Sequence, residues 1–132
     1  LGHPDMREPI QYALGYPDRL TLNNRKLDFA SLATLTFSAP DTERFPALGL
    51  AFEAIRKGGN MPCIMNAANE AAVSAFLQDR IGFYDISDII ASCMEEAEFI
   101  ADPDLDGVFA TNGAVLSIAR EKIKKAAAAR KP

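Results

Sequence analysis

The sequence predicts a mainly α-helical protein, in which an extended arm with one short helix and little β-structure precedes a small bundle of about four helices. Amphipathic segments flanked by helix-capping residues fill the chain after residue 41. Closely spaced prolines interrupt the first twenty residues and exclude a long helix there. With 132 residues the chain is long enough for one compact core. We therefore expect two parts, an arm over residues 1–40 and a helical domain over residues 41–132.

The predicted arm, residues 1–40, contains one short helix. Pro9 can occupy the first turn of this helix, and Gly15 followed by Pro17 ends it. Residues 35–37 alternate in hydrophobicity and include a β-branched side chain, which is typical of a short strand or of an extended contact. Most of the arm is therefore expected to be extended.

Two helices of the predicted domain are recognised by the residues at their ends. Asp41 can cap a turn, after which a helix starts at Pro46 and stops at Gly58-Gly59. A later helix follows Asp85, with Asp88 as the acidic partner of this cap. The apolar stripe of the later helix consists of Ile86, Ile89, Ile90, Cys93 and Met94.

The last helix is expected after a polar connector over residues 102–106. Thr111 is its candidate N-cap. Its apolar face consists of Leu116, Ala119, Ile123 and Ala126. The basic residues of segment 120–131 favour a solvated helix end, where cations interact well with the helix dipole, over a basic arm that binds a membrane or nucleic acid.

The central stretch is the alanine-rich segment Met61–Leu77, which can be helical while offering little side-chain bulk to its neighbours. One helical stripe consists of Ile64, Ala68, Ala71, Ala75 and Phe76. Asn66, Asn69 and Glu70 lie on another face, at spacings of three and four residues. We interpret them as a structural polar cluster that ties down adjoining loops and helix ends. The alternative is a catalytic or ligand-binding carboxamide and carboxylate, which would need a further acid, His, Cys or Ser nearby.

Composition and charge exclude several classes of protein. The net charge is −4, and no basic patch interleaved with aromatic residues is present, so no nucleic-acid partner is expected. No apolar stretch approaches the ~20 residues that a membrane span needs, so no membrane association is expected. Cys63 and Cys93 are far apart among apolar neighbours and are predicted to be reduced core residues. This pattern favours a cytoplasmic protein.

The residues by themselves identify no catalytic, cofactor-binding or metal-binding site. His3 and Asp5 could form a base or ligand pair, but one histidine without a cysteine or a second histidine is a poor metal site. Gly58-Gly59 follows no strand and lacks a phosphate-loop pattern. The serines lack the strained turn that a nucleophile occupies.

Several separated motifs, in order, resemble one enzyme family. They are the runs GHPDMREPIQYALGYPDRL, KLDF, LTFSAPDTERFPALGLAFEAIRKGG and NAANEAAVSAFLQDRIGFYDI. The resemblance is to the C-terminal third of the 1-deoxy-D-xylulose 5-phosphate reductoisomerase family, and it extends from residue 1 to about residue 100. The chain also starts at Leu1 rather than at an initiator Met, so we expect it to be a piece of a longer protein.

The resemblance implies an intact enzyme with an NADPH-binding domain, a catalytic domain with a divalent-metal site (Mg or Mn) and a C-terminal helical domain reached through a linker. Such an enzyme converts 1-deoxy-D-xylulose 5-phosphate to 2-C-methyl-D-erythritol 4-phosphate in non-mevalonate isoprenoid biosynthesis. The implied partners of this chain are the missing NADPH-binding and catalytic domains, in a homodimer. The chain itself is expected to be structural, to bind no cofactor and to be inactive alone.

The resemblance assigns roles to only a few residues. Pro4 and Met6 match family positions on the wall of the substrate and nicotinamide pocket. Asp5 and Arg7 belong to the same motif, where ion pairing or capping would fix the loop. The NAAN-E signature that contains Asn66, Asn69 and Glu70 lies in the helical domain of the family, which agrees with a structural role.

Two other functions remain open from the sequence. A stand-alone helical module could recognise a protein partner through its acidic helix and basic tail. A small autonomous enzyme could use His3 and Asp5.

Overall fold

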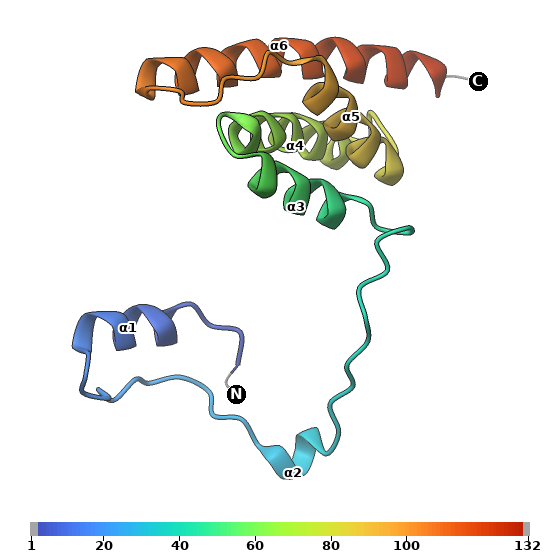
Figure 1. Ribbon diagram of the computed structural model, residues 1–132. Coiled ribbons are helices and arrows are strands. Elements are labelled where there is room, and N and C mark those ends of the chain that lie inside the picture. The colour runs from blue at the N-terminus through green and yellow to red at the C-terminus, as the bar shows by residue number, and fades with distance from the viewer. Residues whose placement is uncertain (1–2, 131–132) are drawn as a thin grey trace. The chain divides into compact units, whose positions relative to one another are not determined.

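The computed structural model describes residues 3–130, and within that range the chain forms six helices and no strand (Figure 1). The helices are α1 (Arg7–Gly15), α2 (Phe29–Leu32), α3 (Ala47–Lys57), α4 (Met61–Leu77), α5 (Phe83–Glu96) and α6 (Leu105–Ala129). The chain divides into two compact units, residues 1–39 and residues 40–132. The predicted mainly α fold class is confirmed.

The first unit is an extended chain with two short helices. α1 ends at Gly15, as predicted. α2 was not predicted; it forms because the Asp28 carboxylate accepts hydrogen bonds from the backbone N–H of Ala30 at 3.0 Å and of Ser31 at 3.4 Å. Residues 35–37, predicted as a short strand or an extended contact, form no strand. No residue from 3 to 39 is buried, so this unit lacks a core of its own.

The second unit is built around α4. Helix α4 packs against α3, α5 and α6, and α5 also packs against α3 and α6, so α3 and α6 lie on opposite sides of the α4–α5 pair (Figure 1). The alanines of α4 that face these neighbours are almost completely buried: Ala67, Ala68, Ala72 and Ala75. Methyl side chains let the neighbouring helices approach closely, so the alanine-rich segment is the centre of the core, as predicted.

The start of α3 and the end of that helix agree with the sequence prediction. Asp41 Oδ1 accepts a hydrogen bond from the Arg44 backbone N–H at 2.9 Å and caps a turn. Pro46 then stands at the N-cap of α3, and Gly58 ends this helix with a φ of 67°. That φ lies in the left-handed region, where glycine carries no Cβ penalty.

The predicted starts of the last two helices were wrong. α5 starts at Phe83, so Asp85 is not the N-cap but the third helical residue, and its Oδ2 accepts from the Gly82 N–H at 2.6 Å. α6 starts at Leu105, because Asp104 Oδ1 accepts from the Gly107 N–H at 2.7 Å and caps this helix. Thr111, the predicted cap, is instead a buried residue inside α6.

The start of α4 is fastened to the connector between α5 and α6 by Asn60, which is 1% exposed. The Asn60 side-chain Nδ2 donates to the Glu98 carbonyl and to Thr111 Oγ1, each at 3.0 Å. Its Oδ1 accepts from the Ile100 N–H at 2.9 Å, and its backbone N–H donates to the Ile100 carbonyl at 2.9 Å. One side chain thus joins α4, the connector and α6, and we call this set of contacts the Asn60 clamp.

Gly59 allows the connector to approach the clamp. Its φ is 56°, and a Cβ at this position would lie 2.3 Å from the Ile100 carbonyl oxygen and 2.9 Å from Phe99 Cε2. Atoms at these distances overlap, so any side chain would push the connector away from Asn60. Glycine is therefore required here by both backbone conformation and space.

We expect Gly59→Ala to lower the free energy of unfolding by about 3 kcal/mol, because it adds the left-handed backbone penalty to the loss of connector hydrogen bonds. Urea unfolding followed by circular dichroism measures this change. Gly113→Ala in α6 is the matched control, since a Cβ there meets nothing within 4 Å. The control should be neutral or stabilise by about 0.5 to 1 kcal/mol. Equal effects of the two substitutions would contradict the steric argument.

We also expect Asn60→Ala to destabilise the second unit by about 3 kcal/mol, because it leaves buried donors and acceptors without partners. Thr111→Val removes one of the same hydrogen bonds, so the double variant should lose less than the sum of the two single losses. Asn66→Ala, an exposed position on α4, is the control and should change stability by less than about 0.5 kcal/mol. Additive losses at Asn60 and Thr111 would show that the two residues are energetically independent.

Candidate functional site

The loop before α1 contains the two residues assigned to a pocket wall, and an ion pair shapes it. Arg7 Nε donates to Asp5 Oδ1 at 3.0 Å, and Arg7 Nη2 donates to Asp5 Oδ2 at 2.6 Å. The Arg7 backbone N–H also donates to Asp5 Oδ1 at 3.0 Å. A two-pronged guanidinium–carboxylate contact fixes direction as well as distance. The side chain of Asp5 and the start of α1 are thus held together.

This ion pair shifts the acidity of Asp5. The side-chain hydrogen bonds from Arg7 and its backbone N–H favour the carboxylate and lower the pKa of Asp5 from 3.8 to about 2. The same contact raises the pKa of the Arg7 guanidinium. Both groups are at the surface, so the interaction shapes the loop more than it stabilises the protein.

Pro4 and Met6 lie on either side of Asp5 and are both exposed, with Met6 70% exposed. Met6 occupies the N-cap position of α1 with a helical φ of −64°. The loop therefore presents an apolar ring and a flexible thioether side chain at its surface while its charged residues pair with each other. The exposed loop can therefore serve as a packing surface. Asp5 and Arg7 bind each other, so neither side chain is placed to transfer a proton. The role of Pro4 and Met6 in a pocket stays a prediction.

Residues 19–24 fold back along α1 and support it through polar contacts. Gln11 Nε2 donates to the Thr21 carbonyl at 3.1 Å, and Asn24 Nδ2 is hydrogen-bonded to Glu8 Oε1. These two contacts tie the first two turns of α1 to the segment that follows the helix. They help to hold the loop geometry in a unit in which none of residues 3–39 is buried.

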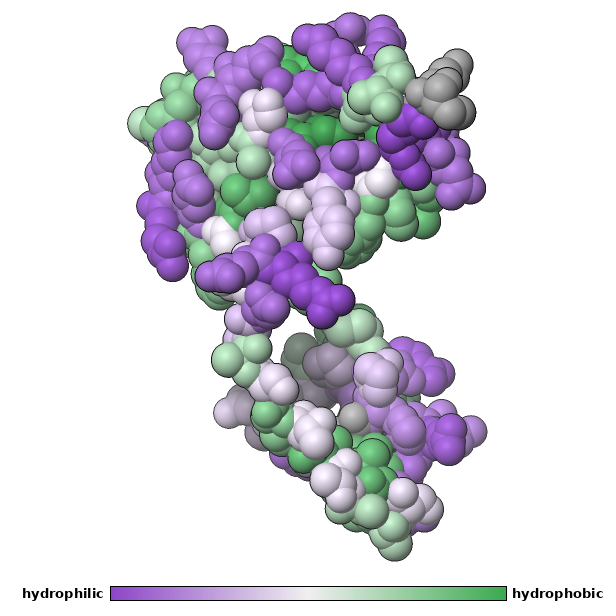
Figure 2. Space-filling view, turned by 90° about the vertical axis from the view of Figure 1, so that its right-hand side faces the viewer, coloured by the Kyte–Doolittle hydropathy of each residue, from purple (hydrophilic) through white to green (hydrophobic). Residues whose placement is uncertain are grey.

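Large apolar side chains are exposed on the first unit, and green, hydrophobic surface is visible there in Figure 2. Several apolar residues of the predicted arm are exposed: Ile10, Tyr12, Leu20, Phe29 and Phe37. Exposed apolar surface of this extent is typical of a segment that packs against another protein surface.

The predicted polar cluster on α4 is less extensive than the Asn60 clamp. Within the described residues, the hydrogen bond of this cluster joins Asn66 Nδ2 to Glu70 Oε1 at 3.3 Å, and Asn69 is half-buried. The residue that ties a loop to helix ends is Asn60, which the sequence analysis missed. Its position directly after Gly58-Gly59 and one residue before the central helix was the available signal. A structural role for the Asn66, Asn69 and Glu70 cluster stays a prediction.

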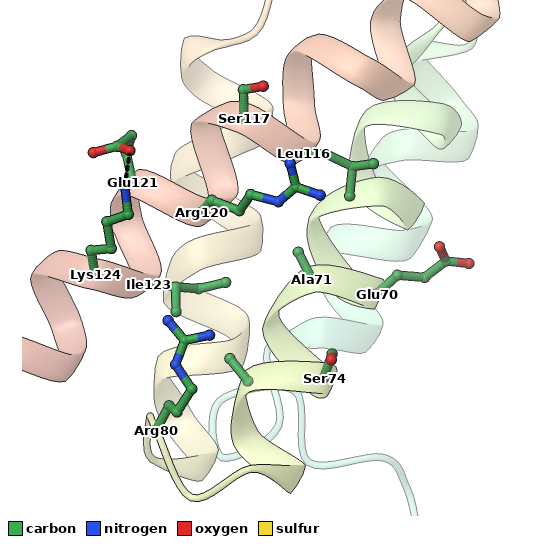
Figure 3. Close-up of a pocket in the computed structure, with 11 residues that line it drawn as sticks. Glu70, Ala71, Ser74, Arg80, Leu116, Ser117, Arg120, Glu121, Ile123 and Lys124 are labelled. Atoms are coloured by element: carbon green, nitrogen blue, oxygen red, sulfur yellow. Dashed lines mark hydrogen bonds and ion pairs between the residues drawn. The ribbon is translucent and has the colours of Figure 1, made fainter.

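A groove of about 590 Å³ lies between α4 and α6 in the second unit (Figure 3). Its apolar floor includes Ala71, Ala75, Leu116 and Ile123. Arg80, from the turn after α4, and Arg120, from α6, extend toward the space between the helices (Figure 3). Neither arginine forms an ion pair with a residue between 3 and 130.

Residues 3–130 contain no group of three His, Cys, Asp or Glu side chains that could hold a metal ion. His3 and Asp5 are therefore not joined by further metal-ligating residues. Both cysteines are free, Cys63 half-buried and Cys93 buried, and burial raises the pKa of each thiol. Among these residues no helix is at once long enough and apolar enough to cross a membrane.

The pKa of Asp5 offers a direct test of the loop geometry. We expect a carboxyl ¹³C titration to give a pKa of about 2, and Arg7→Gln to raise it partway toward 3.8, because the backbone N–H of residue 7 still donates. A depressed carboxyl pKa means that the stabilisation is complete above pH 3.8 and is lost as the pH falls through about 2. Arg19→Gln removes another cation of the same unit and should leave the titration unchanged. A pKa near 3.8 in the unaltered chain would contradict the paired loop.

Comparison with known proteins identifies the family. The protein-family model described as the DXP reductoisomerase C-terminal domain matches residues 1–118 of this chain. The chain is 54% identical over 123 residues to the 1-deoxy-D-xylulose 5-phosphate reductoisomerase of Bacteroides thetaiotaomicron, covering 93% of the chain and 32% of that protein. It is 52% identical over 124 residues to the enzyme of the same name from Acetivibrio thermocellus, covering 94% of the chain and 32% of that protein.

Solved structures give the same result. The chain superimposes on the reductoisomerase of Zymomonas mobilis in complex with NADPH with a TM-score of 0.85 and 44% identity, covering 94% of this chain and 33% of that one. It superimposes on a DOX-P reductoisomerase in complex with NADPH, fosmidomycin and magnesium with a TM-score of 0.84 and 37% identity, with the same coverage. The chain thus spans about a third of the length of these relatives. It belongs to the DXP reductoisomerase C-terminal domain family.

Proposed function

We propose that this chain is the C-terminal part of an NADPH-dependent reductoisomerase that converts 1-deoxy-D-xylulose 5-phosphate to 2-C-methyl-D-erythritol 4-phosphate. In this proposal, residues 1–40 are the end of the catalytic domain and the linker, and residues 41–132 are the C-terminal helical domain. The chain is structural and is inactive without the domains that bind NADPH and the metal. The observation that carries the proposal is the 54% identity to a reductoisomerase along 93% of this chain.

We expect the cofactors of the proposed enzyme to be held by the two-thirds of the relatives' length that this chain does not span. One solved relative is a complex with NADPH and magnesium. Residues 3–130 offer no cluster of metal ligands, so they do not fit a magnesium site. In the whole enzyme, NADPH supplies hydride and the divalent metal polarises the oxygens of the substrate. No step of that chemistry is assigned to a residue of this chain.

The contribution of this chain to the active site is the loop before α1. Pro4 and Met6 would pack along the wall of the substrate and nicotinamide pocket, where apolar side chains exclude water from the reacting groups. The Asp5–Arg7 ion pair would keep that loop in one conformation, since it fixes the backbone directly before α1. The Asp5 carboxylate and the Arg7 guanidinium bind each other within the loop. In this proposal they position the loop and do not act as an acid or a base.

The assembly and location of the protein follow from the same proposal. The exposed apolar residues of the first unit would pack against the missing domains, and the intact enzyme would be a cytoplasmic homodimer. A stand-alone interaction module would need this apolar surface to be dispensable, which its extent argues against.

The proposal is tested by expressing the complete reading frame that contains this chain and measuring NADPH oxidation with 1-deoxy-D-xylulose 5-phosphate. We expect the complete product to turn over with added Mg²⁺ or Mn²⁺, and residues 1–132 alone to show no turnover. Turnover by residues 1–132 alone would refute the structural role. A reading frame whose complete product has no reductoisomerase activity would refute the enzyme assignment and favour the interaction module.

The role of Met6 is tested in the active protein. Met6→Ala should lower kcat/KM about tenfold, because one lost apolar contact at a pocket is worth roughly 1 to 3 kcal/mol. Met6→Leu preserves apolar volume and should keep most of the activity. Unchanged kinetics in Met6→Ala would place this residue outside the pocket.

A further inference from the structure

We propose that the groove between α4 and α6 binds a small organic anion, whose phosphate or carboxylate group is attracted by the guanidinium groups of Arg80 and Arg120 at the groove edges and whose apolar body rests on the groove floor. This site lies in the second unit and uses none of the residues assigned to the reductoisomerase pocket. It can therefore exist whether or not the proposed activity is correct.

The groove has the size and lining of a ligand site. Its volume of about 590 Å³ falls within the range of small-molecule pockets. The floor includes Ala75 and Ile123, which are 2% and 3% exposed and belong to the helical core. A floor anchored in the core does not have to rearrange when a ligand binds. The small alanine side chains of α4 leave space between the two helices, and larger side chains would fill it.

Two arginines approach this space from different elements. Arg80 comes from the turn after α4 and Arg120 from α6, and both guanidinium groups point into the groove (Figure 3). Neither has an ion-pair partner among residues 3–130. A guanidinium group offers N–H donors in a planar fork that matches the oxygens of a phosphate or a carboxylate. Two guanidinium groups at one groove, without ion-pair partners in the described part of the chain, therefore favour an anionic ligand there.

The other charged groups of the groove leave the arginines available. Glu121 Oε1 forms an ion pair with Lys124 Nζ at 2.6 Å, so this carboxylate and this ammonium satisfy each other. Glu70, on α4, is hydrogen-bonded to Asn66. The charges lining the groove are three cations and two carboxylates, so the net charge at the groove is positive.

The backbone that carries Arg80 is fixed, although its side chain is exposed. The Arg80 N–H donates to the Ala75 carbonyl at 3.0 Å, and the Asp79 N–H donates to the Phe76 carbonyl at 2.9 Å. Asp79 has a φ of 57°, so the chain turns sharply at the end of α4 and directs the next residue back over the helix. The position of Arg80 is thus a consequence of how α4 ends.

Two hydroxyl groups complete the polar lining. Ser74 Oγ accepts a hydrogen bond from Gln78 Nε2 at 3.1 Å, so its own proton remains to be donated to an anion. Ser117 Oγ donates to the Gly113 carbonyl at 3.2 Å, so its proton is used within α6 and Ser74 is the hydroxyl that can donate to an anion. Polar edges over an apolar floor favour an anion with a small hydrophobic body over inorganic phosphate alone.

The site is tested on the ¹⁵N-labelled 132-residue chain by NMR titration with phenyl phosphate, benzoate, inorganic phosphate and phenol as separate probes. We expect phenyl phosphate or benzoate to shift the amide signals of Ser74, Arg80, Ser117 and Arg120, and the tighter of these two identifies the preferred charged group. Inorganic phosphate should bind more weakly because it leaves the floor uncovered. Phenol should bind most weakly because it carries no charge.

Variants decide whether the two arginines hold the anion. Arg80→Gln and Arg120→Gln should each weaken phenyl phosphate binding about fivefold, the upper range for one exposed charge contact. Arg56→Gln is the matched control, because Arg56 is an exposed arginine on α3 outside the groove, and it should have no effect. Circular dichroism of each variant confirms that the helices remain folded.

Three outcomes would overturn the proposal. They are amide shifts spread over all cationic surfaces, equal weakening by the Arg56 control, and tighter binding of phenol than of phenyl phosphate. The first two outcomes would mean that the probe binds to any positively charged surface and not specifically to the groove. The third would mean that the groove binds the aromatic ring of the probe and not its charged group.

Discussion

The arrangement of the helical unit depends on the Asn60 clamp. An alanine-rich helix such as α4 can lie close to its neighbours, but methyl groups interlock weakly and leave the direction of approach poorly defined. Asn60 supplies directional hydrogen bonds, which methyl groups cannot form. Its carboxamide joins the connector at Glu98 and Ile100 to Thr111 of α6. A buried amide with its donors and acceptor satisfied accepts few alternative packings. The clamp therefore defines where α6 begins to run along α4.

The groove between α4 and α6 follows from the same arrangement. The clamp holds α6 near the start of α4, and the short side chains at Ala71 and Ala75 leave space farther along the helix pair. Long charged side chains, among them Arg80 and Arg120, line the polar edges of this space. In this way a packing solution that makes the core compact also creates the groove in which Arg80 and Arg120 lie.

The sequence was informative where a local interaction determines the structure and misleading where a distant one does. The ends of α3 were predicted, because proline and glycine act mainly through their own backbone. The buried face of α4 was predicted in part: Ile64, Ala68 and Ala75 are buried as expected, whereas Ala67 and Ala72 are buried in place of Ala71 and Phe76. The start of α6 was misplaced because Asp104 and Thr111 are both acceptable caps in sequence. Only the contact between Asn60 and Thr111, which are 51 residues apart, shows that Thr111 belongs to the buried face.

The candidate sites show the same limit. The PDMR motif indicated that Asp5 and Arg7 would fix the loop, because two residues of opposite charge at this spacing can pair without any other part of the chain. The groove could not be predicted, since Arg80 and Arg120 are 40 positions apart and are brought together only by the packing of α6 on α4.

The two units are stabilised in different ways, and this difference bears on function. The second unit has a continuous buried core, which its four helices share. In the first unit no residue from 3 to 39 is buried, and the local order comes from polar contacts such as Asp5–Arg7 and Gln11–Thr21. Polar contacts of this kind set the conformation of a loop but add little stability in water. A loop that is shaped by polar contacts and surrounded by unpaired apolar residues becomes rigid when that apolar surface is covered. The first unit thus leaves its apolar surface uncovered around a loop shaped by polar contacts, whereas the second unit covers apolar side chains within its own core.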